Sequence, residues 1–293
     1  MRYLILAIAA LALAPLPAIA AEVLILQGSA SPALEQVTRL VQNDCANRNR
    51  TLVLSDYAEV DVQRMVREER PSVVVAIGDH ALSAARKIRS VPVIYAMALG
   101  AETERVGRNV TGVSMMVSPS SYLQLFHRMK LNRVGVLYDQ KRSGAYLQRA
   151  REAAGGSGVE LIDMQVSSPR EVTDRLKDLF KRGIDAIWMI PDTTAITAEN
   201  LESYFNFAQR SNLPVIGFSS AYLSKGALAS IELTRQDIGK NLCIMINGVK
   251  NGEQSESIDP PSGRVRFNDA VARRLGIRIP LISGAIDKRE NDA

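Results

Sequence analysis

Polar and aromatic side chains recur just after the predicted strands, at the positions where parallel α/β sheets bind small ligands. In the first half of the chain these positions hold Gln27, Ser29, Asp79 and His80. In the second half they hold Tyr138, Asp139, Asp192, Thr193, Ser219, Ser220 and Glu232. Carboxylates in such a set suit a ligand ammonium group, and the free N–H groups of neighbouring helix starts suit an anionic group. We therefore expect a small-molecule binding site, although each residue alone is equally compatible with a helix cap or a turn.

The most specific hypothesis concerns Tyr138 and Asp192, which follow neighbouring strands of the second half. Tyr138 offers a flat apolar face with a hydroxyl at its tip. Asp192 offers a negative charge, with Thr193 beside it for hydrogen bonds. We expect the two side chains to hold the ligand together, with Asp192 bound to an ammonium group. The alternative is that Asp192 only orders its own loop.

Catalytic and metal-binding patterns are missing from the sequence. Of the two histidines, His127 is expected on the surface, whereas His80 fits either a ligand site or an ordinary helix start. The chain has no HExxH motif and no cysteine cluster, and residues 217–221 read GFSSA, which is not a G-x-S-x-G nucleophile turn. The glycines of 155–158 precede a predicted strand, so they form a turn and not a phosphate-binding loop. We expect a protein that is not an enzyme and that holds neither cofactor nor metal.

Short apolar runs at regular spacing predict the elements that position these side chains. Strands are expected at 23–26, 51–54, 73–77, 91–97 and 110–115, and then at 134–138, 159–164, 184–190, 215–218 and 227–231. Helix patterns separate them, with start signals at Ser31 and Thr197 and a predicted capping box over 168–171. This alternation is typical of the α/β class. It predicts two Rossmann-like lobes, each built on a parallel sheet that is covered on both faces.

The layout changes at 114–119 and again at 231–235, where we expect the chain to pass between the lobes. A long helix from Thr234 would then return to the first lobe before a last strand and helix rejoin the second. We expect lobe 1 to comprise 21–115 with 234–262 and lobe 2 to comprise 116–233 with 263–282; residues 283–293 form a loose tail. The lobes should move as rigid bodies about the two passages.

The first residues indicate export from the cytoplasm. A short basic start, an apolar run over 4–16 and a small-residue site ending at Ala20 are typical of a secretory signal peptide covering 1–20. Pro15 and Pro17 interrupt the apolar run before it reaches the roughly 18 residues of a membrane span, so we favour a signal peptide over an anchor. The mature protein should begin near Ala21 in the periplasm, and mass spectrometry of the exported protein checks this.

Composition narrows the classes further. The chain has 293 residues, a formal net charge of +5 and basic residues scattered among acidic ones, so nucleic acid is not an expected partner. Its two cysteines, Cys45 and Cys243, both fall on predicted helices among apolar neighbours. Two buried free thiols are the favoured interpretation, but a disulfide stays open because sequence gives no distance between them.

Five segments resemble a known family when they are taken in order. They are 109–114 (NVTGVS), 133–138 (RVGVLY), 185–194 (DAIWMIPDTT), 226–230 (GALAS) and 270–280 (AVARRLGIRIP). Together they are similar to ABC-transporter solute-binding proteins of the tryptophan and tyrosine uptake type. The resemblance implies the type I periplasmic binding protein fold, with a ligand between the lobes and Tyr138, Asp192, Thr193, Ser219 and Ser220 lining its cleft.

Two departures from the family pattern lie on the first-lobe wall of that cleft. Asp79 and His80 stand where many members carry Thr-Pro, and Leu99 and Gly100 stand where an Asp-Pro pair is usual. The ligand of the better-known members is therefore not implied for this chain.

The expected function is capture of a small molecule, such as an amino acid, and its delivery by a monomeric periplasmic protein to an ABC permease of the inner membrane. The alternative is a periplasmic subunit that senses the ligand for a membrane signalling receptor. A neighbouring permease gene would favour the first and a neighbouring kinase or cyclase gene the second.

Overall fold

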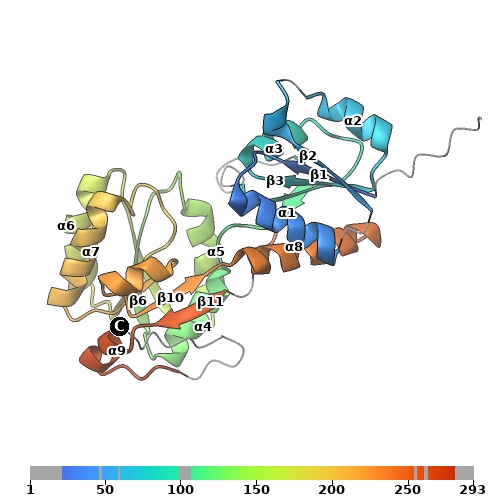
Figure 1. Cartoon of the computed structure of the whole chain (residues 1–293). Coiled ribbons are helices and arrows are strands. Elements are labelled where there is room, and N and C mark those ends of the chain that lie inside the picture. Colours follow the sequence, from blue (N-terminus) through green and yellow to red (C-terminus); the bar gives the residue numbers. More distant parts are fainter. Residues whose placement is uncertain are drawn as a thin grey trace, which may run out of the picture.

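The computed structural model describes residues 22–45, 48–58, 60–98, 107–253, 256–260 and 263–280. The expected signal peptide, the Leu99-Gly100 departure and the expected tail at 283–293 lie outside the described residues. Within them the chain folds into two α/β lobes joined by crossing segments (Figure 1). The predicted fold class, two lobes built on largely parallel sheets, is confirmed.

Lobe 1 is built on a fully parallel sheet with the order β2-β1-β3-β4-β5. Its strands are β1 (Val23–Gln27), β2 (Asn49–Val53), β3 (Val73–Ile77), β4 (Val93–Ala96) and β5 (Val110–Gly112). Its helices are α1 (Pro32–Asp44), α2 (Val62–Glu69), α3 (Asp79–Ala85) and α8 (Arg235–Lys250). Successive β1 residues alternate between the two faces: Val23 and Ile25 join the core under α1 and α8, and Leu24 and Leu26 join the core under α2 and α3. Both faces are therefore buried, which explains the continuous apolar runs.

Lobe 2 is built on a six-stranded sheet with the order β11-β10-β9-β8-β6-β7. Its strands are β6 (Arg133–Tyr138), β7 (Glu160–Gln165), β8 (Ala186–Trp188), β9 (Val215–Gly217), β10 (Ala229–Glu232) and β11 (Arg264–Phe267). Its helices are α4 (Pro119–Arg128), α5 (Gly144–Ala154), α6 (Val172–Lys181), α7 (Ala198–Arg210) and α9 (Asp269–Leu275). Only β11 among the described strands runs antiparallel, because it enters directly from a crossing segment and not through a crossover helix.

Helix starts follow the sequence signals with one difference. Ser31 and Thr197 cap α1 and α7 through their side-chain oxygens, as predicted. The predicted capping box over 168–171 is wrong in detail: Pro169–Glu171 forms a 3-10 turn, and α6 begins only at Val172. The Glu171 carboxylate accepts hydrogen bonds from the Ser167 N–H and the Ser168 hydroxyl, so it stabilises the turn that precedes the helix.

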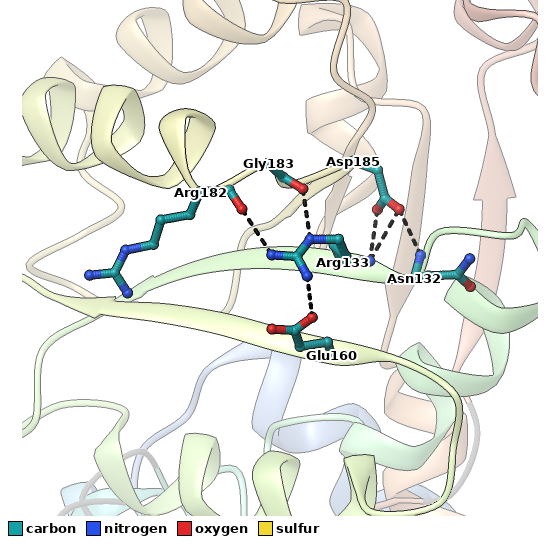
Figure 2. A network of polar contacts seen from close by, with 6 residues as sticks. All are labelled: Asn132, Arg133, Glu160, Arg182, Gly183 and Asp185. Atoms are coloured by element: carbon teal, nitrogen blue, oxygen red, sulfur yellow. Dashed lines mark hydrogen bonds and ion pairs between the residues drawn. The ribbon is translucent and has the colours of Figure 1, made fainter.

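An ion-pair network closes the amino edge of lobe 2 (Figure 2). Arg133 at the start of β6 donates to the Gly183 and Arg182 carbonyls at 2.9 Å each and pairs with Glu160 of β7. The Asp185 carboxylate accepts from the backbone N–H groups of Asn132 and Arg133 at 2.9 and 3.1 Å. This network joins the starts of three adjacent strands, at the edge opposite to the one where parallel sheets bind ligands.

Three segments cross between the lobes. They are residues 113–118, residues 233–234 and residues 256–260, and the third lies beside the first. Ser114 N–H donates to the Ile258 carbonyl, and Ile258 N–H donates to the Gly112 carbonyl, both at 2.9 Å. The sequence predicted passages at 114–119 and 231–235, and the pairing with the third segment was not anticipated.

A disulfide joins Cys45 to Cys243, so the favoured interpretation of two free thiols is wrong. Cys45 ends α1 and Cys243 lies on α8, with their Cα atoms 5.2 Å apart. The helices approach closely because Gly239 has no side chain: a Cβ atom there would lie 2.9 Å from the Leu40 Cβ. The bond therefore ties the first helix of lobe 1 to the helix that returns from lobe 2.

Replacing both cysteines by serine should lower the free energy of unfolding. The bond closes a sequence separation of 198 residues, and the chain-entropy model assigns on the order of 5 kcal/mol to a loop of this size. Urea unfolding followed by circular dichroism measures the loss, and dithiothreitol should have the same effect on the wild type but none on the double variant. An unchanged urea midpoint in the double variant would contradict this role.

Candidate ligand-binding site

The carboxyl ends of the strands carry the predicted site residues in both lobes. In lobe 1, Gln27 is buried and serves the fold: its carboxamide oxygen accepts from the Thr38 hydroxyl at 2.7 Å, and its nitrogen donates to the Ser29 carbonyl at 2.8 Å. These bonds fix the turn between β1 and α1. The Ser29 and Asp79 side chains are exposed at the same edge.

His80 is held in one orientation by the backbone. Its Nδ1 lies 3.1 Å from the Gly28 carbonyl, which accepts hydrogen bonds only, so Nδ1 carries the proton of the neutral ring and Nε2 is left as an acceptor. Beside the ring is a surface hollow of about 260 Å³ whose walls include Tyr57 and Lys87. His80 therefore offers a fixed polar atom at the rim of this hollow.

Tyr57 is a site candidate that the sequence reasoning missed. Its side chain is 52% exposed, against the burial usual for a large aromatic residue, and it lines the same hollow as His80. It follows the 3-10 turn Leu54–Asp56, just beyond the end of β2. An aromatic residue four positions after the end of β2 was the signal that could have indicated it.

In lobe 2, Asp192 is buried and its carboxylate accepts four hydrogen bonds from its own chain. One oxygen accepts from the Thr194 and Ala195 N–H groups, both at 2.8 Å. The other accepts from the Asp139 N–H at 2.7 Å and from the Ser143 hydroxyl at 2.5 Å. Because these donors satisfy the carboxylate within the protein, the structure matches the alternative in which Asp192 orders its own loop. Its contact with a ligand ammonium stays a prediction.

Asp139 directly follows β6 and is only partly buried, unlike Asp192. The Thr194 hydroxyl and the Lys141 N–H donate to it at 2.7 and 2.9 Å, and they hold the pKa of the Asp139 carboxyl below its ordinary value. The acid is therefore ionised at neutral pH. Thr193, which precedes Thr194 in the chain, is exposed.

Tyr138 packs inward against α5 and is only 7% exposed. The Arg151 guanidinium lies 5.5 Å from its ring centroid and donates to its hydroxyl at 3.3 Å. The ring and the hydroxyl are thus both engaged inside lobe 2. The pairing of Tyr138 with Asp192 around a ligand gains no support from these contacts.

The remaining predicted residues lie along the same edge. Ser219 accepts from the Ala221 N–H at 3.3 Å and caps the 3-10 helix Ser220–Lys225, and both serines are partly exposed. Glu232 is the last residue of β10 and lies across from Arg264 in the sheet register. Among the residues that the structure describes, no cluster of histidine, cysteine and acidic side chains is arranged to hold a metal, and no helix is long and apolar enough to span a bilayer.

Replacing the buried Asp192 and the partly exposed Asp139 should lower the free energy of unfolding by different amounts. Asp192→Ala leaves four donors without their acceptor and should lower the free energy of unfolding by about 3 kcal/mol or more. Asp139→Ala removes a partly exposed group and should cost less than about 1 kcal/mol. Urea unfolding of both variants measures the difference, and equal losses would contradict the separate roles of the two acids.

Solved structures of two other proteins resemble this chain over most of its length. The chain resembles the solved structure of an ABC domain in complex with L-Trp from Streptococcus pneumoniae, with 24% identity, a TM-score of 0.50 and coverage of 89% of this chain and 96% of that one. It also resembles the ligand-free, open structure of a substrate-binding protein with adhesive properties from Clostridium difficile, with 20% identity, a TM-score of 0.62 and coverage of 90% and 98%. No curated protein matches the sequence.

A family model decides the assignment. The model for the ABC transporter substrate binding protein matches residues 48–281, which include both sheets apart from β1. The solved structures agree with the two-lobed fold that this family requires. The chain therefore belongs to the ABC transporter substrate binding protein family.

Proposed function

We propose that the protein captures a small molecule carrying an ammonium group between its lobes and delivers it to an ABC permease. The observation that carries the proposal is that each lobe presents, just after a strand, a polar side chain that is at least partly exposed and is held in place by internal hydrogen bonds. In lobe 2 this is Asp139, fixed by Thr194 and the Lys141 N–H. In lobe 1 it is His80, fixed by the Gly28 carbonyl.

The two edges offer different chemistry to one ligand. Asp139 provides a charge for an ammonium group, with the exposed Thr193 beside it for a further hydrogen bond. The hollow at Tyr57 and His80 provides an aromatic face and a hydrogen-bond acceptor. An amino acid with an apolar or aromatic side chain fits both, and the L-Trp complex of the Streptococcus pneumoniae protein supports this class.

The protein would act in the periplasm as a monomer, after removal of the signal peptide covering 1–20. The exposed residues Ser29, Asp79 and Thr193 and the partly exposed Ser220 would complete the walls once the lobes close around a ligand. Delivery then requires that the permease meets the closed form of the protein, since closure is what reports that the ligand is bound.

A thermal-shift screen of the twenty amino acids and small organic acids tests the ligand class. Binding to the folded state raises its stability by about 2.7 kcal/mol when the ligand is at a hundredfold excess over Kd. We expect L-tryptophan or another apolar amino acid to give the largest increase in Tm. A panel in which organic acids without an amine raise Tm as much as amino acids do would overturn the ammonium assignment.

Asp139→Asn should then weaken binding of the amino acid that gives the largest shift by about ten- to a hundredfold, because a charge-assisted hydrogen bond contributes about 1.5 to 3 kcal/mol. Asp174→Asn is the matched control, since Asp174 is an exposed acid on α6, away from the edge. The affinity of the wild type should stay constant near neutral pH and fall only at acidic pH. The reason is that the lowered pKa of Asp139 keeps its carboxyl ionised at every pH above that pKa. Calorimetry that gives equal Kd values for both variants would end the proposed role.

A further inference from the structure

One buried tyrosine of lobe 2 holds the first crossing segment, and another holds the strand β10, which leads into the second. The Tyr146 hydroxyl donates to the Val117 carbonyl at 2.7 Å, and the Tyr122 hydroxyl donates to the Ile231 carbonyl at 3.1 Å. Burial raises the pKa of Tyr122 above its ordinary value, so this hydroxyl stays protonated and remains a donor. The first bond attaches the first segment to the core of lobe 2, and the second fixes the end of β10 from which the second segment leaves.

The tyrosine rings are themselves fixed by Trp188. Its ring centroid lies 4.9 Å from that of Tyr122 and 6.0 Å from that of Tyr146, and all three side chains are at most 2% exposed. Close-packed aromatic side chains of this kind have no room to change rotamer. The Tyr122 and Tyr146 hydroxyls are therefore held as firmly as the rest of the lobe 2 core.

Arg149 of α5 holds the third crossing segment. Its Nε and Nη2 donate to the two Asp259 carboxylate oxygens at 2.7 and 3.0 Å, a bidentate pair. The Asp259 side chain is only 13% exposed, and the Arg149 guanidinium lies 5.6 Å from the ring centroid of Tyr146. A further backbone bond, from Ser118 N–H to the Pro260 carbonyl at 2.8 Å, joins the third segment to the first.

On the other side of these contacts the same segments belong to lobe 1. Val113 and Ile258 form a bridge and pack into the core under α1 and α8. Leu233 packs against both that core and the core of lobe 2. Thr234 already caps α8 through a capping box with Asp237. In each crossing segment, only a few residues therefore lie between the part that packs on lobe 1 and the part that packs on lobe 2.

Rotation of the lobes about their crossing segments is the motion expected of this fold. We propose that side chains of lobe 2 confine this rotation to a line through Ser114–Met115, Leu233 and the Ile258–Asp259 peptide, so that the rest of all three segments moves with lobe 2 as one body. The Arg149–Asp259 pair is the strap that keeps the third segment in this body. The hinge is thus narrower than the passages predicted from sequence. It is also set by side chains of α4 and α5 that lie outside the ligand edge.

Loss of the strap gives the third segment freedom that the other two do not have. The tyrosine bonds are buried, whereas Arg149 is 42% exposed, and water can replace it around Asp259. The third segment can then bend on both sides of Asp259, and not only at the Ile258–Asp259 peptide. Lobe 1 gains orientations that a single hinge line forbids.

Distances between spin labels on the two lobes test the proposal without any ligand. The chain has only two cysteines, and the disulfide uses both, so cysteines introduced at Gln36 and Gln209 are its only free thiols. Both positions are exposed, on α1 and α7. Electron double resonance then gives the distribution of distances between the lobes.

Arg149→Met and Asp259→Asn should each broaden this distribution relative to the wild type. Arg151→Met is the matched control, because Arg151 lies two positions further along α5 and pairs with Asp163 inside lobe 2. It should leave the distribution unchanged. Emission from Trp188, the single tryptophan, reports whether the core of lobe 2 stays intact in each variant.

Two results would overturn the proposal. One is a wild-type distribution in both Arg149→Met and Asp259→Asn, which would show that the strap does not restrain the third segment. The other is equal broadening in Arg151→Met, which would show that any charge lost from α5 has this effect. Neither result bears on the proposed ligand, since every measurement is made on the ligand-free protein.

Discussion

The buried carboxylate of Asp192 determines how the working edge of lobe 2 is built. It gathers donors from the loop after β6, from the start of α5 and from its own loop after β8. The loops after two neighbouring strands are thereby locked together, and Asp139 is left at the rim. Because Ser143 immediately precedes α5, the same carboxylate also fixes the helix that carries Tyr146 and Arg149. The proposed ligand-binding edge and the proposed hinge contacts therefore both depend on the Asp192 carboxylate. Its removal would leave several polar groups without a hydrogen-bond partner at once.

The amino ends and the carboxyl ends of the strands in the lobe 2 sheet carry different groups of polar residues. Arg133 and Asp185, which lie in segments that carry the family resemblance, meet at the amino edge and join β6, β7 and β8 (Figure 2). Asp139 and Thr193 lie at the carboxyl edge. The network residues and the proposed ligand contacts thus lie at opposite ends of the same strands, and the segments that resemble the family, 133–138 and 185–194, extend over both ends.

Sequence patterns predicted the strands because burial on both faces leaves a continuous apolar run, as at β1 and β3. The class of the fold followed from that alternation. The role of Asp192 could not be predicted, since an aspartate after a strand looks the same whether it meets a ligand or four donors of its own chain. The Cys45–Cys243 bond escaped for a similar reason: it depends on where a helix 198 residues later returns, which no local pattern records. Tyr57 was missed because a single aromatic residue in a loop has no period.

The return of α8 to lobe 1 also has a consequence for the order in which the molecule can be assembled. A chain that emerges from its amino end completes the strands β1 to β5 early, but the face that α8 covers stays bare until residues 235–250 have appeared. Lobe 2 obtains nearly all of its strands in the interval. The second lobe in the sequence can thus become compact first, while the apolar face of the first lobe waits for its cover and Cys45 waits for its partner. Until then this apolar face of lobe 1 stays exposed to solvent and prone to aggregation.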